Sequence, residues 1–294
     1  MVESVLLGIV LVMKGVQGYF SKKLSGSLEK RTTYVTYLVF NLFLSALFAG
    51  TAMLVEGRAP RLDASTFWYS CLCGVSIAVC MFANLMALKE GAVVLVQVFS
   101  MAGLLVPCIT GIFLFQESIS IFQLLGIGLL ILSTVFLVSY NTSLYGKITP
   151  KMVVLLVAAL ISNGTTMLAQ KLYAFYIPDG NVSLFSFLGF GIPTVLLALA
   201  VFPIARADGE KLQRLPPRVL AMGAVLAVAL LTVSQLSTIV AKVLPSVLVF
   251  PIVNGGGLIL TTVVAALFFK EKLTAKSVAG LVLGVIAIIA INGL

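Results

Sequence analysis

The chain has 294 residues, of which 61% are hydrophobic and only 10% are charged, and its formal net charge is +9. Soluble domains are about half apolar and a quarter charged, so this composition excludes an ordinary soluble fold and indicates the lipid bilayer as the solvent. Lysine and arginine in short loops orient membrane proteins, and without a basic face the positive charge predicts no nucleic-acid partner. Histidine is absent. With no nucleophile elbow and no phosphate-binding loop either, the sequence favours neither an enzyme nor a bound cofactor.

Apolar runs long enough to cross a bilayer, about 20 residues each, recur along the whole chain. The first, at residues 5–20, lacks a basic leading region and a small-residue cleavage site, so we expect a membrane helix there rather than a secretory signal. The break after the fourth run is the least marked, because Glu117 is its only charge. We predict an all-α, multi-pass protein of the cell membrane with ten transmembrane helices, at residues 3–21, 32–55, 66–88, 92–115, 121–139, 152–175, 183–204, 218–241, 246–269 and 275–293.

The two halves of the chain resemble each other. At a spacing of 154 residues, Phe115-Gln-Glu117 matches Phe269-Lys-Glu271. The same spacing places residues 91–95 on 245–249, Gly103 on Gly257 and Gly126 on Gly280, and a spacing of 149 lays residues 15–22 on 164–171. We therefore predict two five-helix repeats, at residues 1–145 and 146–294. Because five is odd, the second repeat enters the membrane from the opposite side, and inverted repeats of this kind are typical of secondary transporters with a substrate near the midplane.

The ends of the fourth helices carry a more specific resemblance. Phe115-Gln-Glu117 and Phe269-Lys-Glu271 each close a fourth helix, and each is followed by a glycine-bearing fifth helix, at residues 121–139 and 275–293. In these features the whole chain resembles the drug/metabolite transporter superfamily, in its ten-helix EamA-like branch. The resemblance implies transport of small organic metabolites, usually export, through a cavity lined by helices 1, 3, 4, 6, 8 and 9. One departure is Lys14 before Gly15, where the family often has an aromatic residue.

The charges of the loops predict an orientation. Segments after the odd-numbered helices hold 14 lysines and arginines, and the opposite side holds four, at Arg58, Arg61, Lys171 and Lys242. The positive-inside rule places the first group in the cytoplasm and both termini outside. The family resemblance implies the reverse orientation. Both interpretations put the two termini on the same side.

Lys14 is the most informative single residue. It lies roughly 3 Å past the middle of the first predicted span, where a charge costs about 2.5–3.5 kcal/mol to insert. Such a lysine either faces a cavity or snorkels toward the boundary at Lys22. All ten acidic residues fall at helix ends or in loops. No mid-membrane carboxylate is left to pair with Lys14 or to bind a cation, so we expect an anionic, zwitterionic or neutral solute.

Other polar side chains in the spans complete the predicted substrate site. Gln17 lies one helical turn from Lys14. The full candidate set is Lys14, Gln17, Asn84, Gln97, Ser100, Asn163, Gln235 and Asn254. For each asparagine or glutamine, a hydrogen bond between helices is an equally open interpretation. The four cysteines lie in apolar runs without disulfide or zinc spacing, and no metal site is expected.

The backbone of the ninth span carries a further signal. Pro251 removes one helical hydrogen bond and predicts a kink, while Gly255-Gly256-Gly257 either exposes backbone groups to a solute or allows close helix packing. Together these features favour a secondary transporter of amino acids or other carboxylate or zwitterionic solutes. The alternative is a membrane-embedded non-transporter, either a lipid-modifying enzyme or a scaffold. A monomer and a homodimer are both open.

Overall fold

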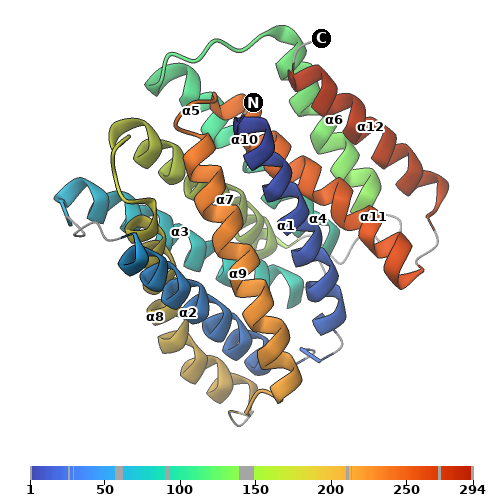
Figure 1. The fold of residues 1–294 in the computed structure, drawn as a ribbon. Coiled ribbons are helices and arrows are strands. Elements are labelled where there is room, and N and C mark those ends of the chain that lie inside the picture. Colours follow the sequence, from blue (N-terminus) through green and yellow to red (C-terminus); the bar gives the residue numbers. More distant parts are fainter. Residues whose placement is uncertain are drawn as a thin grey trace.

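The structure is a computed structural model that describes residues 2–25, 27–28, 30–56, 62–89, 93–138, 149–209, 212, 214–270 and 273–292. Within these residues all regular elements are helical (Figure 1). Nine described segments are long and apolar enough to cross a membrane, and Ile121–Leu137 is a shorter apolar helix. The chain is therefore a multi-pass helical membrane protein.

Eight helices run without interruption, and the predicted spans match them to within a few residues. They are α1 (Val2–Ser25), α2 (Arg31–Val55), α3 (Ala64–Lys89), α6 (Ile121–Val138), α7 (Pro150–Tyr176), α8 (Val182–Asp208), α9 (Pro217–Val240) and α12 (Ala275–Asn292). Local capping fixes several ends. The side chains of Thr149 and Asn181 accept hydrogen bonds from the first turns of α7 and α8, and α8 ends at Gly209, which has a φ of +65°.

The fourth and ninth predicted spans are each interrupted. The fourth consists of α4 (Val93–Ala102) and α5 (Leu105–Leu114), and the ninth consists of α10 (Ser246–Pro251), a π-helical turn η1 (Ile252–Gly256) and α11 (Gly257–Phe269). Proline cannot donate to the carbonyl four residues earlier, so Pro107 and Pro251 each weaken the helical ladder just where it changes. At Pro251 the predicted kink takes the form of this π-helical turn.

The helices pack in pairs drawn from both halves of the chain. α6 lies along α12 at one edge of the bundle, and α2 lies along α8 at the opposite edge (Figure 1). Between them, α1 packs on α9 and α11, and α3 packs on α7 and α8. Glycines allow the close approach of α6 and α12, since a Cβ on Gly126 would lie 2.7 Å from Ile291 and one on Gly280 would lie 2.9 Å from Leu137. Small residues at such interfaces strengthen van der Waals packing in a bilayer.

The bundle has two distinct ends. α1 begins and α12 ends at the upper end of the view in Figure 1, where α10 also begins. α1 ends and α2 begins at the opposite, lower end. We use these names, upper end and lower end, for the two sides of the bundle.

Candidate functional site

An inner cavity of about 200 Å³ lies among helices of both halves. Its polar lining comes from α1, α7, α9 and η1, with Lys14, Asn163, Gln170, Ser234 and Asn254 among the residues that face it. Its apolar lining comes chiefly from α2, α3, α8 and α10. None of the described residues that line it is acidic.

Lys14 reaches this cavity along a path that Gly257 leaves open. A Cβ at residue 257 would lie 3.0 Å from Cγ and 3.1 Å from Cδ of Lys14, so even alanine would crowd the lysine stem. No described residue forms a hydrogen bond or an ion pair with Lys14 Nζ. The Lys14 amine therefore lines the cavity without a carboxylate partner from the described part of the chain.

The other polar side chains of the inner cavity are held by neighbouring helices. Gln170 Nε2 donates to Ser234 Oγ at 3.1 Å, which ties α7 to α9. Asn254 Nδ2 donates to the carbonyl of Phe250 at 3.0 Å across the π-helical turn. Ser237 is 3% exposed, and its Oγ has no hydrogen-bond partner among the described residues. The sequence analysis did not include Gln170, Ser234 or Ser237 in the site, although all three are polar residues within predicted spans.

A second group of predicted site residues lies directly behind Asn163. Asn163 Nδ2 donates to the carbonyl of Ser100 at 2.6 Å, and Ser100 Oγ donates to Asn84 Oδ1 at 3.3 Å. Neither Ser100 nor Asn84 is among the residues that line the cavity. These two residues therefore orient Asn163 and connect α3, α4 and α7, which is the interhelical alternative left open by the sequence.

Two predicted residues lie away from the cavity. Gln97 is exposed and lines no cavity that the structure describes. Gln235 donates to Ser183 Oγ at 3.1 Å, and Ser183 in turn donates to Glu56 at 2.5 Å, in a polar cluster at the upper end.

The described residues of the fourth span also contribute nothing to the lining of the inner cavity, whereas α2 and α8 do. This lining differs from the set of helices that the family resemblance implies.

A wide cavity of about 680 Å³ adjoins the inner one toward the lower end. Met81 and Leu230 line both cavities. Gln17 and Ser21 from α1 and Arg31 and Asn41 from α2 are the main polar residues of the wide cavity. Of the eight predicted residues, Lys14, Asn163 and Asn254 therefore line the inner cavity and Gln17 lines the wide one.

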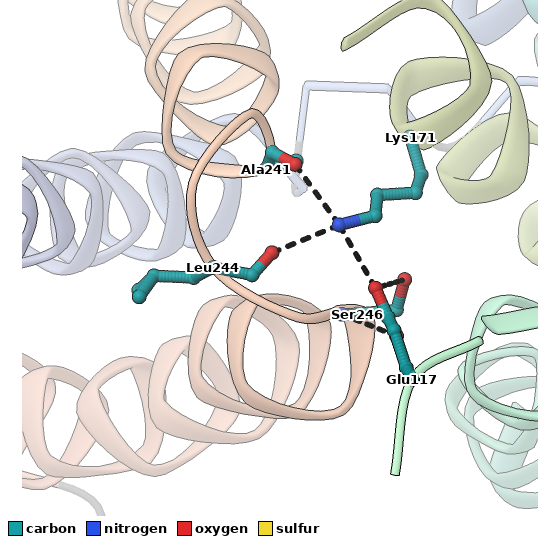
Figure 2. A network of polar contacts seen from close by, with 5 residues as sticks. All are labelled: Glu117, Lys171, Ala241, Leu244 and Ser246. Carbon is teal, nitrogen blue, oxygen red and sulfur yellow. Dashed lines mark hydrogen bonds and ion pairs between the residues drawn. The ribbon is translucent and has the colours of Figure 1, made fainter. Parts of the chain in front are cut away.

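At the upper end, a buried ion pair joins three segments (Figure 2). Lys171 Nζ lies 2.9 Å from Glu117 Oε1, and the two side chains are only 6% and 8% exposed. Lys171 Nζ also donates to the carbonyls of Ala241 and Leu244, at 3.1 and 3.0 Å, and the backbone N–H of Ser246 donates to Glu117 Oε2 at 2.9 Å. We call these five residues the upper junction. It links the loop after α5, the last turns of α7 and the connection from α9 to α10.

Two neighbours fit closely around the upper junction. A Cβ on Gly111 would lie 2.5 Å from Glu117 Oε2, so any other residue at this position would displace the carboxylate from where it lies against α5. Lys171 Nζ lies 5.5 Å from the centre of the Phe115 ring, within the range of a cation–π contact. The sequence analysis took Glu117 as a break between spans and as part of the repeated Phe-x-Glu motif, and did not predict its burial, because hydropathy does not reveal whether a loop carboxylate is buried.

Comparisons with known proteins identify a fold and no family. No family model matches the chain, and no curated protein matches it. Among solved structures, one described as "Crystal structure of protein" aligns with 99% of this chain and 96% of its own, with a TM-score of 0.72 and 13% sequence identity. At this identity the two chains share a fold, and the likeness carries no information about substrate.

Proposed function

We propose that the protein is a secondary transporter of small organic solutes that carry a carboxylate, such as amino acids and other anionic or zwitterionic metabolites, and that it acts in the cell membrane. The observation that supports this most strongly is Lys14, which lines a cavity with no acidic lining residue among those described. A cation so deep in a bilayer costs about 2.5–3.5 kcal/mol, which a bound anion would offset. A scaffold would not need such a lysine, and a lipid-modifying enzyme should need a clustered acid, histidine or nucleophile at the interface, a pattern that the sequence analysis did not find.

Ten transmembrane helices in two inverted repeats belong to this proposal. α6 and α12 both have 18 residues, and the spacing of 154 lays Ile121 on Ala275. The same spacing relates Gly126 to Gly280 and Leu137 to Ile291. The close approach of Gly126 to Ile291 therefore has a symmetric counterpart in the close approach of Gly280 to Leu137, and both are present. A twofold axis in the membrane plane would produce such reciprocal contacts, so they support the inverted arrangement.

The pairing of helices supports the same symmetry. If the repeats are exchanged, α1 corresponds to α7, α2 to α8, α3 to α9 and α11 to the α4–α5 span. The packing of α1 on α9 then becomes that of α7 on α3, and the packing of α1 on α11 becomes that of α7 on α4 and α5, all of which occur. The α2–α8 and α6–α12 pairs map onto themselves. This pattern agrees with the EamA-like plan of the drug/metabolite transporter superfamily.

The unequal ends of the bundle support alternating access as the mechanism of the proposed transporter. The wide cavity extends from the inner cavity toward the lower end, whereas the upper junction packs segments of both halves together at the upper end. Rocking of residues 1–145 against 146–294 would separate the upper junction and close the wide cavity. The loop charges predict a cytoplasmic lower end, and the family resemblance predicts the reverse.

A thermal-stability screen of the purified protein tests whether Lys14 binds a carboxylate. Glutamate, succinate, glucose and tetraethylammonium would be compared for wild type, Lys14→Met and Lys23→Gln. Lys23 is an exposed lysine near the lower end of the same helix and serves as the matched loss of charge. At about 100 times its dissociation constant, a ligand stabilises the fold by roughly 2.7 kcal/mol. We expect this shift with an anion in wild type and Lys23→Gln, and its loss in Lys14→Met; stabilisation by the cation alone would refute the proposal.

A further inference from the structure

Arg31, the first residue of α2, is a second cation that lines the wide cavity. Its Nη1 lies 3.3 Å from Asp208 Oδ1, its Nη2 donates to the sulfur of Met86 at 3.4 Å, and its buried Nε has no partner among the described residues. A guanidinium presents five donors in a planar fork that matches a carboxylate bidentately. Among the described residues its partners are one carboxylate oxygen at the long distance of 3.3 Å and one weak sulfur acceptor, so most of its capacity to bind an anion is unused.

A second unused donor lies between Arg31 and Lys14. Gln17 lines the same wide cavity, and its buried Nε2 has no hydrogen-bond partner among the described residues. Gln17 is one helical turn from Lys14 on α1, so the two side chains share a face. No described residue that lines the wide cavity is acidic. The two adjoining cavities thus offer donors for an anion, with Arg31 and Gln17 in the wide cavity and Lys14 in the inner one.

The two cations line different cavities. Arg31 lines the wide cavity and Lys14 lines the inner one, and the two cavities share Met81 and Leu230. A solute that enters from the lower end would therefore meet Arg31 first and Lys14 second.

We infer that Arg31 forms an outer subsite that binds the carboxylate of the solute before, or after, it reaches Lys14. This inference rests on the proposed transport function and adds a second anion-binding residue to it. Asp208 holds Arg31 in the empty state, and the incoming carboxylate replaces that single contact with two. Gln17 then donates a hydrogen bond to the carboxylate as the solute passes from one subsite to the other.

Initial rates of uptake of radiolabelled glutamate and succinate into proteoliposomes test this inference. Wild type would be compared with Arg31→Gln, Arg31→Lys, Asp208→Asn and the control Lys23→Gln, at low and high ionic strength. For Arg31→Gln we expect KM to rise at least tenfold at low salt, with the maximal rate within about twofold of wild type. For Arg31→Lys the rise in KM should be smaller, and Asp208→Asn should lower KM by removing the competing carboxylate. High salt should reduce the differences in KM between the variants because it screens exposed charges.

Two other results would overturn the inference. An unchanged KM in Arg31→Gln, or a lower maximal rate with an unchanged KM, would mean that Arg31 only pins α2 to α8. If Arg31→Gln fails to fold, an unchanged KM in both Arg31→Lys and Asp208→Asn overturns it equally. The failure of the proposed function looks different, since Lys14→Met would then transport as well as wild type, or wild type would transport neither anion. If transport requires Lys14 but Arg31→Gln keeps the wild-type KM, the proposed transport function stands and only the outer subsite is refuted.

Discussion

Glu117 and Lys171 illustrate, at the scale of single residues, how a charged pair is tolerated inside a membrane protein. Each charge has the other at 2.9 Å, and each has further hydrogen bonds from or to the backbone between Ala241 and Ser246. Desolvation of two charges costs several kcal/mol per ion, and the full set of partners is what offsets it. Loss of one partner should therefore be worse than loss of both.

Single and double substitutions test this expectation. We expect Glu117→Gln or Lys171→Met alone to destabilise the fold by about 3–5 kcal/mol, because each leaves an uncompensated buried charge. The double variant Glu117→Gln/Lys171→Met should recover most of the loss. Thermal unfolding in detergent measures all three. Additive effects of the two substitutions would show that the pair is not energetically coupled.

Two glycines of α1 provide a matched comparison of helix packing. A Cβ on Gly18 would lie 2.5 Å from Thr261 Cγ2, whereas a Cβ on Gly8 would meet nothing within 4 Å. We expect Gly18→Ala to destabilise the protein by about 1–3 kcal/mol through overpacking against α11. Gly8→Ala should stabilise it by up to about 1 kcal/mol through helix propensity. Unfolding midpoints of the two variants that move in the same direction would contradict the close α1–α11 contact.

At the scale of helices, the π-helical turn η1 links a break in the backbone to the site. The turn directly follows Pro251, and Asn254, its third residue, lines the inner cavity. A π-helical turn holds one more residue than an α-helical turn, so its loss would rotate Asn254 by roughly 100° relative to the residues that follow. The turn is therefore expected to set the position of the Asn254 amide.

Replacement of Pro251 tests the role of this turn. Pro251→Ala restores a backbone donor to α10, so we expect unchanged or higher thermal stability but at least tenfold slower uptake of glutamate or succinate. Pro203→Ala is the control, because Pro203 is an exposed proline inside α8 that lines neither cavity. Wild-type uptake by Pro251→Ala would show that the site does not depend on the π-helical turn.

The sequence predicted helix positions much better than helix faces. Each span must be about as long as the bilayer is thick, so apolar runs and polar breaks locate the helices to within a few residues. The prediction that Lys14 belongs to the substrate site has a similar basis, since a charge deep in the membrane is costly enough to imply a cavity. Which side of a helix turns inward depends on packing, and so Ser234 lines the inner cavity while its neighbour Gln235 bonds to Ser183. Likewise, hydropathy contains no signal for the burial of Glu117 or for the π-helical turn.

At the scale of the whole molecule, the arrangement of helices makes a prediction about topology. α1 begins and α12 ends at the upper end (Figure 1). We expect reporter fusions at the N- and C-termini to report the same side of the membrane, and a reporter inserted between α6 and α7 to report the other side. Termini on opposite sides would contradict ten membrane spans. The same fusions decide between the orientation given by the loop charges and the one implied by the family resemblance.

The central claim is that the protein moves carboxylate-bearing solutes across a membrane by way of Lys14. Counterflow in proteoliposomes tests it most directly: vesicles loaded with unlabelled glutamate or succinate are diluted into a trace of the same labelled solute. We expect transient accumulation of label with wild type and with Lys23→Gln, and at least a hundredfold slower accumulation with Lys14→Met. Equal accumulation by Lys14→Met and wild type, or none by wild type with either anion, would contradict the claim.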